Sequence, residues 1–308
     1  MTARLLRLAT RSSPLALQQA HQVKQRINAL HPDINIELVT LTTTGDQQQH
    51  VALHQLGGKS VFVKTLQTAV LNNQADFAVH CIKDMSVNPS DGLELAAILP
   101  RAAAEDVWVS EKFPSIADFP ENGVIGTSSP RRTCQIKAAL PNCRIALCRG
   151  NINTRITHLI EGRYDAIILA HAGLIRLGIT QPAAAALSMS DFIPAIGQGA
   201  LGIECRVDDP STKDIVSQLN DPETQDCVTA ERQVNRLLGG DCQSAVAAHA
   251  YLSNDTLHLN AMVGDLKDFS TISSSHCMPR EDSIALGNYV AQQLIEQGAR
   301  EYLKYQPT

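Results

Sequence analysis

The sequence predicts an α/β protein made of two similar α/β units and a smaller α+β domain. Over the first two thirds of the chain, apolar strands alternate with amphipathic helices, which indicates mainly parallel sheets with helices on both faces. This alternation stops at a loop near residues 100–104 and then starts again. From about Asp221 the pattern changes to a helix, an antiparallel hairpin and a final helix. A chain of 308 residues is also long for a single core, so several domains are expected.

The first unit begins with the strand LLRLAT at residues 5–10. A helix follows, with five apolar residues on one face: Ala16, Ala20, Val23, Ile27 and Leu30. The other elements expected in this unit are the strands 34–42, 76–82 and 93–99 and the helix 61–73. The polar stretch from Gly45 to Lys59 between them could be a lid over a site or a plain surface loop.

The second unit repeats this plan, and the last third departs from it. Strands are expected at 105–110, 123–129, 143–148 and 164–173, with helices from Pro130 and at 152–162. The apolar, Gly-punctuated segment 193–205 is interpreted as a crossing strand or a hinge. The smaller domain is expected to hold a helix at 222–240 ending in Gly-Gly, a hairpin over 245–264 and a helix at 282–297.

Composition excludes several classes of protein. A net charge of −5 argues against non-specific nucleic-acid binding, and no run approaches the roughly 20 apolar residues of a membrane span. The N-terminus shows no signal-peptide core. The eight cysteines form no CxxC and no zinc-type spacing, so no metal is expected. The thiols are expected to be reduced, in a cytoplasmic protein.

Residues 126–132, GTSSPRR, place two arginines in the first turn of a predicted helix. Pro130 suits the first helical position. The helix N-terminus carries a partial positive charge, which disfavours Arg131 and Arg132 unless an anion lies between them and the backbone amides. The motif therefore predicts an anion site. The alternative is that Ser129 caps the helix while both arginines point to solvent.

A matching strand–hydroxyl–proline–helix motif, TRSSP, occupies residues 10–14 and includes Arg11. Alone it could be an ordinary Ser-Pro helix start, but its recurrence in the second unit favours an anion site. Arg149, Arg155 and Arg176 also lie at strand ends or on the next helix. Strand ends line the ligand crevice of open α/β sheets, so the group predicts convergence on a polyanion. Each arginine taken singly could be a surface charge.

The segment HCIKD ends a buried strand with Lys83 and Asp84. A carboxylate held among cations would stay ionised and could stabilise a developing cation or move a proton. A Lys–Asp pair in a turn is the alternative. Strand alternation puts His80 and Cys81 on opposite faces, and both are expected to pack.

Cys242 comes just after the Gly-Gly helix stop, with one aspartate between them, so it is expected in an accessible loop. Such a thiol suits covalent attachment or nucleophilic attack. The other cysteines lie in apolar strands or helices, where a buried inert thiol is the default.

Together these motifs resemble the porphobilinogen deaminase family, also called hydroxymethylbilane synthases. The resemblance runs in order along essentially the whole chain. It is carried by LRLATRSSPLALQQA, TGD, LGGKSVFVK, VHCIKD, GTSSPRR, RGNINTR, YDAIILAHAGLIRLG, IPAIGQGALGIECR and TAERQVNRLLGGDC.

The resemblance implies three domains, with the active cleft between the first two. Domain 1 would span 1–99 with 199–217, domain 2 would span 104–194, and both would have the topology of type II periplasmic binding proteins. Domain 3, 221–308, would carry Cys242 joined by a thioether to a dipyrromethane cofactor built from two substrate molecules.

The implied activity is a transferase reaction of porphyrin and haem biosynthesis, in a cytoplasmic monomer. Four porphobilinogens are joined head to tail with loss of ammonia, and hydrolysis releases the linear tetrapyrrole.

The resemblance also implies roles for single residues. Asp84 would be catalytic and stabilise the azafulvenium cation. The other matching positions would bind the carboxylates of the pyrroles. For the cofactor these are Lys83, Thr127, Ser129, Arg131 and Arg132, and for the substrate they are Arg11, Ser13, Lys59, Arg149, Arg155 and Arg176. Lys59 and the 45–60 loop match the family's mobile cover.

Five positions depart from the family pattern: Gln67, Cys81, Ser86, Pro130 and Ala245. The arginines, Asp84 and Cys242 are retained, so an active enzyme is expected. Two rivals stay open. One is a non-catalytic anion-binding protein of the same fold, and the other is a cysteine-dependent redox or transfer enzyme without a bound pyrrole.

Overall fold

The structure is a computed structural model, and it describes residues 4–42, 60–180, 182–240 and 244–304. The chain forms two compact units, Met1–Ala102 with Ala200–Gln225 and Ala103–Gly199 with Asp226–Thr308. Lys59, most of the 45–60 loop and Cys242 lie outside the described residues.

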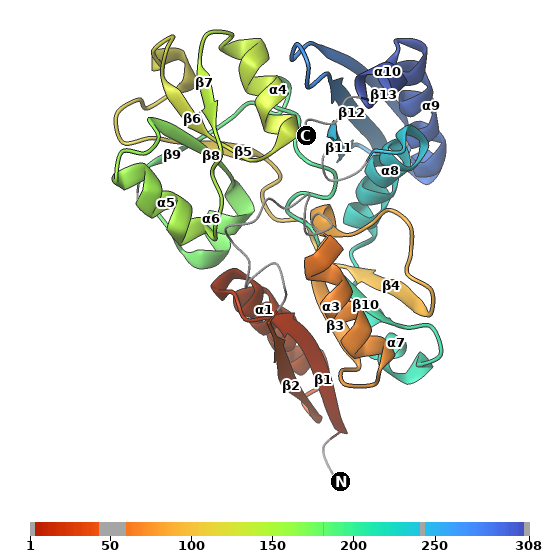
Figure 1. Cartoon of the computed structure of the whole chain (residues 1–308). Helices are drawn as coiled ribbons and strands as arrows, with labels where there is room; N and C mark the ends of the chain where they lie inside the picture. The colour runs from red at the N-terminus through yellow and green to blue at the C-terminus, as the bar shows by residue number, and fades with distance from the viewer. Residues whose placement is uncertain (1–3, 43–59, 181, 241–243, 305–308) are drawn as a thin grey trace. The chain divides into compact units, whose positions relative to one another are not determined.

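The first unit is built on a five-stranded sheet in the order β2-β1-β3-β10-β4. β1 is parallel to β2 and β3, and β10 is antiparallel to β3 and β4, so β10 alone opposes the other four strands. In Figure 1, β10 lies among the orange strands although it comes a hundred residues later in the chain. The elements of this unit are β1 (Arg4–Arg11), α1 (Pro14–Leu30), β2 (Ile34–Leu41), α3 (Ser60–Leu71), β3 (Phe77–Cys81), the 3₁₀ turn η2 (Ile82–Asp84), β4 (Leu93–Ile98), β10 (Leu201–Arg206), α7 (Pro210–Val216) and the 3₁₀ turn η4 (Ser217–Leu219).

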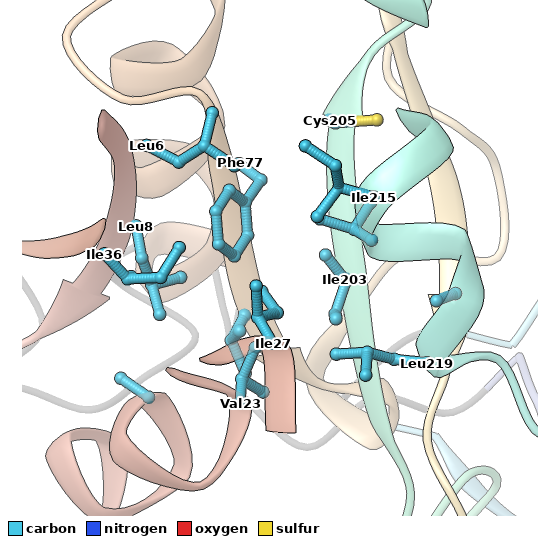
Figure 2. Packing of buried hydrophobic residues seen from close by; sticks show 14 of the residues in the cluster. Leu6, Leu8, Val23, Ile27, Ile36, Phe77, Ile203, Cys205, Ile215 and Leu219 are labelled. Atoms are coloured by element: carbon cyan, nitrogen blue, oxygen red, sulfur yellow. The ribbon is translucent and has the colours of Figure 1, made fainter. Parts of the chain in front are cut away.

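Helices cover both faces of this sheet, because alternate strand residues are apolar on each side. On one face, Val23 and Ile27 of α1 and Ile215 of α7 pack with Phe77 and Ile203 (Figure 2). On the other face, α3 packs against the sheet through a separate apolar cluster. That cluster consists of Ala9, Leu66, Val70, Ala75, Ala78 and Leu93.

The second unit contains a sheet of the same plan, in the order β7-β6-β8-β5-β9. Here β6 is parallel to β7 and β8, and β5 is antiparallel to β8 and β9, so β5 is the one opposing strand. The elements are β5 (Asp106–Val109), the 3₁₀ turn η3 (Ile116–Asp118), β6 (Val124–Gly126), α4 (Pro130–Ala139), β7 (Arg144–Ala146), α5 (Ile152–Ile160), β8 (Ala166–Ala170), α6 (His171–Leu177) and β9 (Ala184–Ala186).

The last part of the chain forms a three-stranded antiparallel sheet in the order β11-β12-β13. The β11–β12 turn has Asn254 and Asp255 at φ 49° and 59°, the left-handed conformation that a two-residue hairpin turn needs. The elements are α8 (Pro222–Leu238), β11 (Ala245–Ser253), β12 (Thr256–Gly264), β13 (Thr271–Pro279), the 3₁₀ turn η5 (Arg280–Asp282), α9 (Ser283–Glu296) and α10 (Ala299–Tyr302).

The predicted fold class is confirmed: two α/β sheets of like topology precede a smaller α+β part. The predicted strand 164–173 was too long, since β8 ends at Ala170 and α6 begins at His171. The strand within 193–205 begins only at Leu201. β13 was missed because its exposed run of serines shows no apolar alternation. The division into three domains at the stated boundaries stays a prediction.

Candidate active site

Lys83 and Asp84 lie at the carboxyl end of β3, in the 3₁₀ turn η2, and both are half-buried. β1 runs parallel to β3, so Arg11 at the end of β1 lies at the same edge of the sheet. Ser13 follows Arg11 and caps α1, its hydroxyl accepting a hydrogen bond from the Ala16 amide at 3.4 Å. The first unit thus has a carboxylate, two cations and a helix N-terminus at one edge of its sheet.

Arg131 and Arg132 are buried, not directed to solvent, with exposed fractions of 4% and 8%. Both bind Asp106, the first residue of β5, which is 1% exposed. Arg132 binds it in a bidentate manner, Nη2 to Oδ1 at 2.7 Å and Nε to Oδ2 at 3.1 Å. Arg131 donates from Nη2 to Oδ2 at 2.8 Å. The solvent-directed alternative is therefore wrong.

The anion expected beside these arginines is supplied at least in part by the protein itself. Burial would raise the pKa of Asp106, but the charges of Arg131 and Arg132 outweigh it and hold that pKa far below its ordinary value of 3.8. One carboxylate faces two guanidinium groups, so the cluster keeps a net positive charge. Thr127 and Ser129 shape the turn before it: the Thr127 hydroxyl accepts from the Ser129 amide at 3.2 Å, and Ser129 caps α4.

The segment 193–199 is tied to this cluster by side chains. Arg131 donates to the Ile193 carbonyl at 2.8 Å, and Gln198 donates from Nε2 to Asp106 Oδ1 at 2.8 Å. Arg176 of α6 donates to the Gly199 carbonyl at 2.7 Å. The segment expected to be a crossing strand or a hinge is therefore held at several points, and one N–H donor of Arg176 is bound to its backbone.

Arg149 and Arg155 form a second concentration of positive charge with Arg132. Burial is the main cause that lowers the pKa of Arg155, and the charges of Arg132 and Arg149 lower it further. These guanidinium groups concentrate positive charge near the ends of β6 and β7, a chemistry that suits carboxylates and other anionic groups. Their convergence on a polyanion stays a prediction.

Helix α4 also packs against β11 and β12, the hairpin that begins three residues after Cys242. The approach is so close that a Cβ on Gly264 would lie 2.6 Å from Cys134 Sγ and 3.2 Å from Ala245 Cβ. Only glycine fits there. The helix that carries Arg131 and Arg132 therefore lies against the start of the strand that follows Cys242 in the sequence.

The cysteines within the described residues are all free thiols. The expectation of a buried thiol is confirmed for five of them: Cys134, Cys143, Cys148, Cys205 and Cys227. It is wrong for Cys277, which is exposed on the edge strand β13, and Cys81 is half-buried.

Thiol-labelling should separate these groups. Burial is the main cause that raises the pKa of Cys134 to about 12 and that of Cys205 to about 11, so both stay protonated and unreactive at pH about 8. Iodoacetamide treatment of the folded protein, read by peptide mass spectrometry, is expected to modify Cys277 and to spare Cys134 and Cys205. In denaturant all three should react. Equal labelling of Cys134 and Cys277 in the folded protein would contradict the burial described.

No three His, Cys, Asp or Glu side chains among the described residues are grouped so as to hold a metal ion. None of the described helices is long and apolar enough to cross a membrane.

Comparison with known proteins places the chain in a family. The description "Porphobilinogen deaminase, dipyromethane cofactor binding domain" matches residues 6–214, and "Porphobilinogen deaminase, C-terminal domain" matches residues 225–296. The chain belongs to the porphobilinogen deaminase family. Porphobilinogen deaminases of two Coxiella burnetii strains, Dugway 5J108-111 and CbuG_Q212, are each 44% identical over 301 residues, covering 98% of this chain and 97% of theirs.

Solved structures outside the family resemble the chain only remotely. The methionine binding protein MetQ aligns with a TM-score of 0.44 at 10% identity, covering 70% of this chain and 89% of its own. The VFT2 domain of Bordetella pertussis BvgS aligns with a TM-score of 0.41 at 10% identity, covering 70% and 86%.

Two residues of the buried arginine cluster, Asp106 and Gln198, were not predicted from the sequence. Asp106 begins an otherwise apolar, fully buried strand, and an acid in that position was the signal that could have found it. Gln198 was interpreted only as part of a crossing strand or a hinge. Its amide carries no charge, so nothing in the local pattern marks it.

Proposed function

We propose that this chain is a hydroxymethylbilane synthase, which joins four porphobilinogen molecules head to tail with loss of ammonia and releases the linear tetrapyrrole by hydrolysis. The observation that carries the proposal is the crowding of Arg132, Arg149 and Arg155, in the part of the chain that matches the family's cofactor-binding domain. Each pyrrole of the substrate bears an acetate and a propionate. A cluster of guanidinium groups is the matching chemistry, because it binds carboxylates with charge-assisted hydrogen bonds.

The described residues also fit a dipyrromethane cofactor. The cluster of Arg131, Arg132 and Asp106 keeps a net positive charge, and α4 packs against the strand that begins three residues after Cys242. When bound, the dipyrromethane supplies the pyrrole carbon to which the first substrate is joined. Lys83, Thr127, Ser129, Arg131 and Arg132 are proposed to hold it.

Asp84 is proposed as the catalytic residue. Loss of ammonia breaks a carbon–nitrogen bond of porphobilinogen and leaves a cation, and an ionised carboxylate nearby stabilises the developing charge. The carboxylate can also take the proton that the attacking pyrrole carbon releases. Lys83 in the same turn and Arg11 at the same sheet edge bring positive charge to the edge that carries Asp84.

The remaining cations are proposed to bind the carboxylates of the incoming and growing chain. These residues are Arg11, Lys59, Arg149, Arg155 and Arg176, with Ser13 as a supporting donor. The proposal also includes three points that rest on the resemblance alone: a monomeric state, a cytoplasmic location and the three-domain division.

Intact mass spectrometry tests the proposed function. Protein purified from cells that make porphobilinogen is expected to exceed its sequence mass by two linked pyrroles, and Cys242→Ser is expected to lose both this adduct and the activity. Cys277→Ser is the matched control, because it removes an exposed thiol and should keep the adduct. An unmodified wild-type mass would favour the non-catalytic anion-binding protein. An adduct that survives in Cys242→Ser would contradict the attachment site.

A further inference from the structure

Three polar side chains meet in the first unit, two of them buried on strands β3 and β10 and one half-buried on helix α3. His80 and Glu204 are 4% and 3% exposed. The His80 Nε2 lies 3.2 Å from the Glu204 Oε2, and the Gln67 Nε2 donates to the Glu204 Oε1 at 3.0 Å. Sequence reasoning assigned His80 to packing and noted Gln67 only as a departure from the family pattern.

This cluster lies in an otherwise apolar layer between the sheet and α3. In the strand register His80 is opposite Gly202, and Glu204 is opposite Ala78, so both side chains lie on the face that α3 covers. Neither the His80 Nε2 nor the Glu204 Oε2 has a hydrogen-bond partner within the part of the chain that the structure describes. A buried polar group is costly unless it is paired. The two atoms lie 3.2 Å apart, which is close enough for an ion pair when His80 is protonated.

The same two strands hold the turn that carries Asp84. The Ile82 amide donates to the Ala200 carbonyl at 3.2 Å, one strand position beyond the β3–β10 ladder. The Ile82 side chain occupies the space above Gly202, where an added Cβ would lie 2.5 Å from its Cδ1. The turn is therefore built on β10, and any shift of β10 along β3 moves the backbone of residues 82–84.

We propose that His80 and Glu204, braced by Gln67, are positioning residues for Asp84. Their side chains cross the β3–β10 pair diagonally, two residues before the turn begins, and resist a slip of one strand along the other. Gln67 cannot take a proton, so its amide always donates to Oε1 and leaves Oε2 directed to His80. This inference rests on the proposed function, because it assigns the pair to the placement of the catalytic carboxylate.

The test compares Glu204→Leu with Glu204→Gln. The glutamine can still accept from Gln67 and offer an N–H to His80, whereas leucine removes both contacts. With porphobilinogen as substrate, Glu204→Leu is expected to lower kcat by about 10-fold to 100-fold, the effect of a small misplacement of a catalytic group. KM and the pyrrole adduct mass should stay near wild type, and Glu204→Gln should keep kcat within about threefold.

Asp76→Asn is the matched control for stability. Asp76 directly precedes β3 at its other end and accepts hydrogen bonds from Arg7, including Nη2 to Oδ1 at 2.9 Å. This variant should lower the unfolding midpoint without lowering kcat. Should Glu204→Leu fail to fold, His80→Leu combined with Glu204→Leu replaces the buried pair by apolar side chains, which often preserves stability.

The outcomes separate the two levels of inference. Wild-type kcat in a folded Glu204→Leu or in the double variant would overturn the positioning role, as would an equal loss in Asp76→Asn. A wild-type protein that carries no adduct and makes no tetrapyrrole would instead contradict the proposed function.

Discussion

Asp84→Ala is expected to abolish tetrapyrrole formation while the protein stays folded. The side chain is half-buried in the turn after β3, so its removal leaves no large cavity in the core. The lost electrostatic stabilisation of the cation should lower kcat by at least about 100-fold, the usual effect of removing one group that stabilises a transition-state charge. The measurement is the rate of tetrapyrrole formation from porphobilinogen, with circular dichroism to check folding.

Two variants control the Asp84 experiment. Asp84→Asn keeps the shape and removes the charge, so it should be almost as impaired as Asp84→Ala if the charge is what matters. Asp91→Ala removes an exposed carboxylate seven residues further on and should leave the rate unchanged. Substantial turnover by Asp84→Ala would refute the assigned role.

Asp106→Asn is expected to have the largest effect on stability. The substitution leaves two buried guanidinium groups facing a neutral amide, and breaking a buried ion pair in this way costs about 3–5 kcal/mol. Arg131 and Arg132 lose their common anchor, so the pyrrole adduct is expected to be incomplete as well. Chemical denaturation measures the first effect, and intact mass measures the second.

The effect of Asp106 has a defined pH dependence. Its pKa is lowered in the folded state from an ordinary 3.8, so its contribution to stability is fully present above that value and is lost as the pH falls through the lower folded pKa. The difference in unfolding free energy between wild type and Asp106→Asn should therefore be constant from neutral pH to about 5 and shrink below about 4. Asp191→Asn, at an exposed position in the same unit, should show no difference. Equal stability of wild type and Asp106→Asn at neutral pH would contradict the role of the buried pair.

Local pattern was sufficient to predict most elements of the fold. Strands β1 and β3 and helix α1 follow directly from apolar residues at the right spacing, and Ser13 and Ser129 mark helix starts by their capping chemistry. The elements that were missed, such as β9 and β13, lack an apolar period. Their pairing depends on neighbouring strands, and no local signal reports that.

The candidate site divides in the same way. The position of Arg131 and Arg132 at the positive end of a helix indicated an anion, because the helix dipole is a local property. The position of the two arginines did not identify which anion binds there. Asp106 lies 25 residues before Arg131 in the chain and reaches it only because β5 returns antiparallel beside β8.

The sequence by itself thus determined the class of fold, the family and the residue types at the strand ends, since these depend on local periodicity and on motifs read in order. The tertiary structure alone decided which charges are compensated within the protein. It paired Asp106 with Arg131 and Arg132, and Glu204 with His80 and Gln67, across strands and helices far apart in the chain. The physical reason is that a charge buried in a low-dielectric interior is stable only with a partner within about 3 Å. The fold can supply that partner from any part of the chain, however far away it lies in the sequence.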